Sequence, residues 1–237
     1  GATSYTETGV IQDLWSGYGK IIRVHLENAS AQSAVIKHVH WPTIKNHPRG
    51  WNSDLGHQRK LKSYQVETTW YQEYSKYSQA RLPHCYAFER QDDEVLMVLE
   101  DLDASGFPLR KSSLQWHEIE AVLAWLAKFH ASYLGQEPTG LWKVGTYWHL
   151  ETRPQELAAL SDQRLKEGGG CGMKDVAYFI GSCLNEKECE RLEGKILDSY
   201  FEKLQRALPA NNQDLEKEWR SLYRLAWADF HRFLKGW

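Results

Sequence analysis

Apolar and polar residues alternate along much of the first hundred positions, as they do in strands with one buried face. The alternation predicts five strands, at residues 10–15, 20–27, 33–40, 85–90 and 94–99. In the third strand Ala34 and Ile36 face one side of the sheet, and Lys37 faces the other. The intervening residues 41–57 are rich in Pro, His, Gly and Asn, which predicts a long surface insertion.

In the second part of the chain, apolar positions recur every three to four residues, which is the period of an amphipathic helix. The clearest case is residues 117–134, with a stripe formed by Ile119, Val122, Leu123, Leu126 and Phe129. Further helices are predicted at residues 154–165, 174–184, 186–207 and 214–236, and one helix, at residues 58–76, interrupts the strands of the first part. Strands with one helix among them, followed mostly by helices, predict an α+β fold of two lobes, residues 1–102 and 103–237.

The composition, with 42% apolar and 25% charged residues, is that of a folded protein. A net charge of −2 provides no basic field, so neither nucleic acid nor an anionic membrane is expected as a partner. Apolar runs such as residues 95–99 are too short to span a bilayer, and the first residues contain no apolar signal core. A cytoplasmic location is therefore expected. The four cysteines lack CxxC spacing, which favours buried free thiols.

The turn between the first two strands reads Ser-Gly-Tyr-Gly and contains Gly17 and Gly19. Without a Cβ, such a turn lets backbone N–H groups approach phosphate oxygens closely. Lys37 on the next strand would reach the α- and β-phosphates, and Glu67 in the following helix would pair with its ammonium group. A lysine in a strand is usually a solvated surface residue, so it is the order of turn, lysine and glutamate that favours a nucleotide site.

Several stretches of the sequence resemble one group of small-molecule kinases. Residues 47–52 read HPRGWN, and residues 57–67 contain HQRK and SYQVE. Residues 98–102 read VLEDL, and residues 126–131 read LAKFHA. These motifs are similar to those of the aminoglycoside phosphotransferase, choline kinase and ecdysteroid kinase-like group, especially bacterial relatives of the ecdysteroid kinase-like enzymes. The resemblance covers most of the chain.

This resemblance implies a bilobal protein kinase-like fold, with a small five-stranded antiparallel sheet lobe and a larger, mainly helical lobe. It implies ATP and Mg²⁺ as cofactors, and transfer of the ATP γ-phosphate to a hydroxyl of a choline-, aminoglycoside- or ecdysteroid-like acceptor. It also implies that the carbonyl of Glu100 and the N–H of Leu102 meet the adenine edge. A plain connection between strand and helix is the alternative for these two residues.

Members of this group carry a loop of the form His-Gly-Asp, four residues, Asn, followed by a strand that ends in Asp-Phe. No His-Gly-Asp triplet occurs in this sequence, so no catalytic residue and no metal ligand is assigned within it. Residues 164–167 lead directly into residues 168–179, which resemble the segment after Asp-Phe. Either the chain is a truncated relative, or residues of a longer chain are absent at this join. The second is favoured because deletion of the loop and its sheet would remove buried core strands.

The helix after this join begins near Asp175, which is predicted to cap the helix or, by the resemblance, to buttress the catalytic loop. The predicted acceptor pocket lies on the last helix, where ring faces and one carboxylate would hold a cation. Its residues are Trp219, Tyr223, Trp227 and Asp229. The same spacing is also that of a core stripe. A second aromatic cluster consists of Trp142, Tyr147 and Trp148.

Two other function classes compete with the kinase. One is a nucleotide-binding protein without turnover, and the other is an aromatic helical interaction module, which would need no cleft. The sequence determines neither the acceptor nor the oligomeric state.

Overall fold

A computed structural model describes residues 1–14, 17–41, 54–91, 93–143, 171–210 and 212–235. The chain divides into two compact units. The sheet unit consists of Gly1–Gln58 and Leu82–Arg110, and the helical unit consists of Arg59–Arg81 and Lys111–Trp237. The two-lobe arrangement and the predicted boundary between residues 102 and 103 stay predictions.

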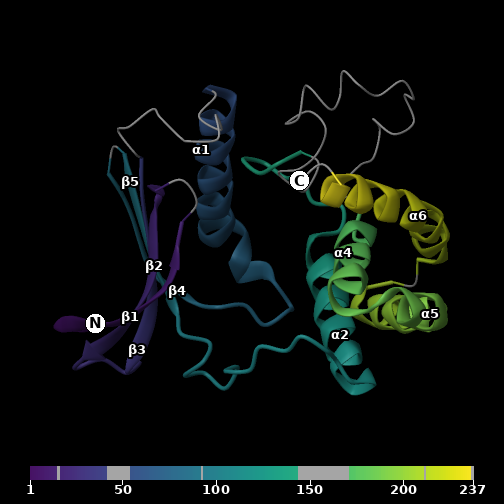
Figure 1. Cartoon of the computed structure of the whole chain (residues 1–237), viewed down its shortest axis with the longest axis horizontal. Coiled ribbons are helices and arrows are strands. Elements are labelled where there is room, and N and C mark those ends of the chain that lie inside the picture. The colour runs from purple at the N-terminus through teal and green to yellow at the C-terminus, as the bar shows by residue number, and fades with distance from the viewer. Residues whose placement is uncertain (15–16, 42–53, 92, 144–170, 211, 236–237) are drawn as a thin grey trace. The chain divides into compact units, whose positions relative to one another are not determined.

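The sheet unit contains one antiparallel sheet of five strands in the order β1-β2-β3-β5-β4 (Figure 1). The strands are β1 (Ser4–Asp13), β2 (Gly19–Glu27), β3 (Ser33–His40), β4 (Cys85–Gln91) and β5 (Glu94–Glu100). Because only α1 (Asp54–Thr69) interrupts the strands and the other described helices follow them, the strands and helices are largely segregated, and the chain is of the α+β class. The predicted class and the predicted antiparallel sheet are confirmed.

The two faces of the sheet follow the predicted alternation. Ala34 and Ile36 are buried on one face, in a cluster with Ile22 and Val24 of β2. Lys37 projects from the other face, where the register aligns it with Ile21, Met97 and Phe88 in one row across β2, β3, β5 and β4. Met97 in this row is 1% exposed, so the face that carries Lys37 is partly covered as well.

The first strand begins six residues earlier than the sequence pattern predicts. All ten residues of β1 are exposed, including Tyr5, Val10 and Ile11. An edge strand with two exposed faces needs no alternation of apolar and polar residues, so the pattern that marks the other strands is weak here. Pairing with β2 is what defines the strand, with register shifts between Glu7 and Gly9 and between Val10 and Gln12.

The helix after β3 differs from its prediction at both ends. The α-helix α1 spans Asp54–Thr69, four residues earlier at its start than predicted. A π-helical turn at Trp70–Tyr74 and a 3₁₀ turn at Ser75–Tyr77 continue it to the predicted end. Wider and tighter turns differ little in residue spacing over a single turn, so periodicity does not separate them from an α-helix.

The later helices of the helical unit are α2 (Trp116–Tyr133), α4 (Met173–Cys183), α5 (Glu186–Ala207) and α6 (Gln213–Lys235), all within two residues of their predicted ends. Capping boxes begin two of them, with Gln115 and Glu118 at α2 and Asn185 and Glu188 at α5. Helix α2 packs on α5 and α4 packs on α6, and Figure 1 shows the four helices gathered together. Their buried faces form one apolar core that includes Leu123 and Phe201.

Three predictions fall on residues outside those that the structure describes. They are the centre of the surface insertion, the helix at residues 154–165, and the join between residues 167 and 168. The second aromatic cluster is described only at Trp142. The cysteines at 85, 171, 183 and 189 are free, as predicted, but they are half-buried and not buried.

Candidate functional site

The glycine turn places its two glycines under different constraints. Both have positive φ, +74° at Gly17 and +119° at Gly19. A Cβ on Gly17 would meet nothing within 4 Å, whereas a Cβ on Gly19 would lie 2.1 Å from the carbonyl oxygen of His38 on β3. Because atoms that are not bonded to each other cannot approach so closely, Gly19 is required by the contact between β2 and β3. Gly17 is favoured by its backbone conformation alone.

The residue between the two glycines anchors this turn from inside. Tyr18 is 4% exposed, and its hydroxyl lies 2.5 Å from Nδ1 of His57 in the first turn of α1. The carbonyl oxygen of Tyr18 also accepts a hydrogen bond of 3.0 Å from the N–H of His40. Burial raises the pKa of Tyr18, so its hydroxyl stays protonated at neutral pH. Sequence analysis missed this residue, although a large aromatic ring between two turn glycines indicates an anchored turn.

The structure places Lys37 on the strand next to the glycine turn. Gly19 pairs with Val39, two residues along β3 from Lys37, so the turn and the lysine are separated by about 7 Å along the strand. Residues two apart on a strand share a face, and Lys37 is half-buried there. Glu67 lies in α1 and belongs to the helical unit. Its pairing with Lys37 therefore stays a prediction.

The two residues predicted to meet adenine lie at the end of β5 and just after it: Glu100 is the last residue of the strand, and Leu102 lies in the connection that follows. The N–H of Glu100 donates to the carbonyl of His84 at 2.7 Å, and its side-chain Oε2 accepts from the N–H of His84 at 3.0 Å. The carbonyl of Leu102 accepts hydrogen bonds from the N–H groups of Ser105 and Phe107, at 3.2 and 2.8 Å. Residues 102–107 therefore fold back into a compact turn.

Between these two residues lies a buried carboxylate that sequence analysis did not single out. Asp101 is 4% exposed and accepts two hydrogen bonds from Arg23 of β2, from Nε at 2.8 Å and from Nη2 at 3.2 Å. The hydroxyl of Ser33 on β3 donates a third at 2.9 Å. Arg23 and Asp101 are 78 residues apart in the sequence, so no local motif marks the pair. The hydrogen bonds to Asp101 raise the pKa of Arg23 further.

A second carboxylate extends this network into the connection. Asp103 accepts a hydrogen bond of 2.6 Å from Nη2 of Arg23 and one of 2.7 Å from Nη2 of Arg110. Arg110, and after it Arg23, hold the pKa of Asp103 below its usual value. The connection is thus tied to β2 by one arginine that bridges two carboxylates.

In the helical unit the predicted positioning residue Asp175 contacts a buried histidine. Oδ2 of Asp175 lies 3.0 Å from Nε2 of His130 on α2, and Nδ1 of His130 lies 2.7 Å from the hydroxyl of Tyr200 on α5. A carboxylate only accepts, so a neutral His130 donates from Nε2 to Asp175 and accepts at Nδ1 from Tyr200. Burial, with an added contribution from the Asp175 charge, raises the pKa of Tyr200 and keeps it a donor. The prediction that Asp175 caps its helix is wrong, because the N-cap of α4 is Gly172 and Asp175 lies within the first turn. Its support of a catalytic loop stays a prediction.

The predicted acceptor residues lie in different surroundings. Trp219 and Tyr223 are buried in the helical core, 7% and 3% exposed. Asp229 is paired with Lys174 at 3.7 Å and with Arg232 at 2.9 Å. Trp227 is half-buried, and its indole N–H donates to the hydroxyl of Tyr223. Two of the four residues thus form core, and an acceptor pocket built from all four stays a prediction.

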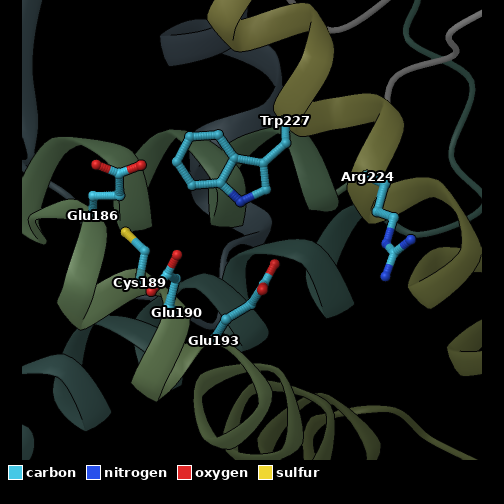
Figure 2. Close-up of a pocket in the computed structure, with 6 residues that line it drawn as sticks. All are labelled: Glu186, Cys189, Glu190, Glu193, Arg224 and Trp227. Carbon is cyan, nitrogen blue, oxygen red and sulfur yellow. The ribbon is translucent and has the colours of Figure 1, made fainter.

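Trp227 also lines an open groove of about 370 Å³ between α5 and α6. Figure 2 shows its indole reaching from α6 toward residues of α5. The groove is lined by Glu186, Cys189, Glu190, Glu193, Arg224 and Trp227. Three carboxylates and one arginine make this surface predominantly acidic.

Within the described parts of the chain, no group of three or more His, Cys, Asp or Glu side chains is arranged to hold a metal ion. None of the described helices has both the length and the apolarity of a membrane span.

Comparison with known proteins identifies a family. The model of the ecdysteroid kinase-like family matches residues 18–138, about half of the 237 residues. The match begins at Tyr18 inside the glycine turn and includes Lys37, Glu67, Glu100 and Leu102. No curated protein matches the chain. The resemblance expected from the sequence motifs is confirmed, and the chain belongs to the ecdysteroid kinase-like family.

Proposed function

We propose that this chain is the nucleotide-binding part of a phosphotransferase that moves the ATP γ-phosphate to a hydroxyl of a small molecule, with Mg²⁺ as cofactor. The observation that carries the proposal is the family match, which includes the second half of the turn, the lysine and the connection after β5 in their kinase-like order. The open space at Gly17 supports it, because a Cβ there would meet nothing within 4 Å and a backbone without a Cβ can approach phosphate closely.

Each of the predicted residues has a defined task in this proposal. The turn with Gly17 and Gly19 would lie against the phosphates, and the Lys37 ammonium would neutralise them from the neighbouring strand. Glu67 would hold that ammonium in place, and the carbonyl of Glu100 and the N–H of Leu102 would meet the adenine edge. Mg²⁺ is proposed from the family membership alone, since the described side chains provide no cluster of metal ligands.

The reaction itself needs little covalent chemistry from the protein. The acceptor oxygen forms a bond to the γ-phosphorus while the bond from that phosphorus to the β,γ-bridging oxygen breaks, and ADP leaves. The hydroxyl proton passes to a base, for which the sequence contains no His-Gly-Asp motif. The named residues therefore bind and orient the nucleotide, and positioning of this kind is a large part of phosphoryl-transfer catalysis.

Thermal unfolding with and without ATP and Mg²⁺ tests the nucleotide site. A ligand that binds only the native state raises the apparent stability, by about 2.7 kcal/mol at a hundredfold excess over its Kd. Lys37→Ala should lose most of this gain, whereas Lys187→Ala, a change on the exposed side of α5, should keep it. Equal ATP-dependent stabilisation of both variants would contradict the role of Lys37.

Turnover is tested separately by ADP release. Release of ADP that depends on an added amino alcohol, aminoglycoside or sterol would support the phosphotransferase. ATP binding without ADP release in the presence of any of these would instead support a nucleotide-binding protein without turnover.

A further inference from the structure

We propose that Asp101, held by Arg23, is a positioning residue that sets the relative direction of two backbone groups, the carbonyl of Glu100 and the N–H of Leu102, which in the proposed function would meet the adenine base. This inference rests on the proposed function, because it concerns the same nucleotide site. It assigns a role to a buried carboxylate, 4% exposed, that the proposed chemistry does not otherwise use.

The covalent structure of the chain gives Asp101 this position. The carbonyl of Glu100 belongs to the planar peptide unit that precedes the Cα of Asp101, and the N–H of Leu102 belongs to the unit that follows it. Only φ and ψ of Asp101 set the angle between those two planes. Whatever holds Asp101 therefore holds the relative direction of the acceptor and the donor.

The side chain of Asp101 is fixed from several directions. Arg23 of β2 donates to both carboxylate oxygens, at 2.8 and 3.2 Å, and Ser33 of β3 donates to Oδ2 at 2.9 Å. The N–H of Asp103 donates to Oδ1 at 3.2 Å. A buried carboxylate that lost these donors would carry the full desolvation penalty, so the arrangement is strongly preferred over its alternatives.

Arg23 also links Asp103, which follows Leu102 in the connection, to the strand β2. Its Nη2 donates to Asp103 at 2.6 Å, and Asp103 in turn accepts from Arg110 at 2.7 Å. The carbonyl of Leu102 is bonded within the turn to Phe107. The residues on both sides of the Leu102 N–H are thus restrained, which reduces the ordering entropy that a ligand would otherwise have to offset.

A fixed acceptor and donor in this order suit one purine base. Adenine presents an amino donor beside a ring-nitrogen acceptor, whereas guanine presents a carbonyl acceptor beside an N–H donor at the same edge. A carbonyl oxygen has two lone pairs, so Glu100 can accept from adenine in addition to any bond it already makes. The geometry thus assigns Asp101 a role in selecting adenine over guanine nucleotides.

Calorimetric titration of the chain with ATP, GTP and inorganic tripolyphosphate tests this role. Asp101→Asn and Arg23→Lys should each weaken ATP binding about tenfold, as expected for loss of alignment in a pair of hydrogen bonds. In both variants the preference for ATP over GTP should fall together with the affinity for ATP. Binding of tripolyphosphate, which has no base, should stay unchanged. Glu7→Gln, which removes an exposed carboxylate from the same sheet, should leave all three affinities unchanged.

The outcomes separate the inference from the function on which it rests. A wild-type chain that binds neither ATP nor tripolyphosphate overturns the proposed function and the inference together. A wild-type chain that prefers ATP, with an Asp101→Asn variant that keeps the same preference, overturns the inference alone. Equal loss of ATP and tripolyphosphate affinity also overturns it, because that pattern indicates a general loss of structure.

If Asp101→Asn fails to fold, Ser33→Ala provides the same test with a smaller change. This substitution removes one hydrogen bond from the Asp101 carboxylate and leaves the ion pair with Arg23 in place. Its preference for ATP over GTP should fall about threefold, which is less than the full effect of one hydrogen bond to a charged group. A folded Ser33→Ala variant with unchanged preference would contradict the role of the network.

Discussion

The described apolar cluster of the sheet unit consists of Ile22, Val24, Ala34 and Ile36, whereas sixteen buried residues, among them Tyr200 and Phe201, form the cluster of the helical unit. The sheet unit instead buries a charged group, Asp101, which is paired with the half-buried Arg23. The glycines of the two units also differ in what prevents a side chain at their positions. Gly19 is constrained by the backbone of a neighbouring strand, and Gly172 and Gly181 by side chains of the helical core. The backbone thus defines the candidate nucleotide site, and side-chain packing defines the helical unit.

The largest effect is expected from Gly19→Ala. Its Cβ would lie 2.1 Å from the carbonyl oxygen of His38, and φ of +119° is unfavourable for any residue with a side chain. Strain and clash together should cost about 3 kcal/mol or more in the free energy of unfolding, measured by urea denaturation. Gly17→Ala, with positive φ but open space, should cost only about 1 kcal/mol. An equal loss of unfolding free energy in both variants would contradict the view that only Gly19 is constrained by the backbone of β3.

Gly172→Ala tests packing as the determinant in the helical unit. Gly172 has helical dihedral angles, so no backbone strain arises, but its Cβ would lie 2.6 Å from both His130 and Trp219. Overpacking should lower the free energy of unfolding by about 2 kcal/mol. Gly194→Ala inside α5 meets nothing within 4 Å and should raise it by about 0.5–1 kcal/mol. Destabilisation by both changes would show that helical glycines here serve something other than packing.

Tyr200→Phe tests how much a buried polar group contributes to the stability of the helical unit. The change removes the hydroxyl that donates to Nδ1 of His130 and leaves that nitrogen without this donor in the core. The expected loss is about 1 kcal/mol in urea denaturation. Tyr77→Phe, at a ring that is 61% exposed, should change stability by less than about 0.5 kcal/mol. A negligible effect at Tyr200 would mean that a water molecule replaces the hydroxyl.

The smallest effect is expected at Asp103, as a dependence on pH. Its pKa is lowered in the folded chain by Arg110 and Arg23, so ionised Asp103 stabilises the fold above the unfolded value of about 3.9. That contribution is lost as pH falls through the lower folded pKa. The stability difference between wild type and Asp103→Asn should therefore be constant near neutral pH and shrink in acid, as measured by urea denaturation at several pH values. A difference that grows below pH 4 would contradict this sign.

Four of the five strands and most of the described helix ends could be predicted to within about two residues. These elements have one buried face, so their period appears in the sequence. The start of β1 could not be predicted, because an exposed edge strand is specified by pairing with β2 and not by its own pattern. The π-helical turn at Trp70–Tyr74 was missed for a similar reason, since it changes hydrogen bonding within a continuing helix.

The part of the candidate site whose residues lie close together in the sequence could be predicted. Gly17 lies in the turn, Gly19 begins β2 and Lys37 lies on β3, so a short stretch of sequence places them near one another. The anchor between Tyr18 and His57 spans 39 residues and was not predicted, although both residues flank predicted elements. No local spacing rule relates residues that meet only after the chain has folded back on itself.

By itself, the sequence determined the order of strands and helices, the glycine turn followed by a strand lysine, and membership of the ecdysteroid kinase-like family. Only the tertiary structure decided which polar groups meet, as in the bonds from Arg23 to Asp101 and from His130 to Asp175. It also decided that Trp219 is core while Trp227 lines a groove. The reason is that periodicity records which face of an element is buried, whereas the partner on that face is chosen by packing between distant segments.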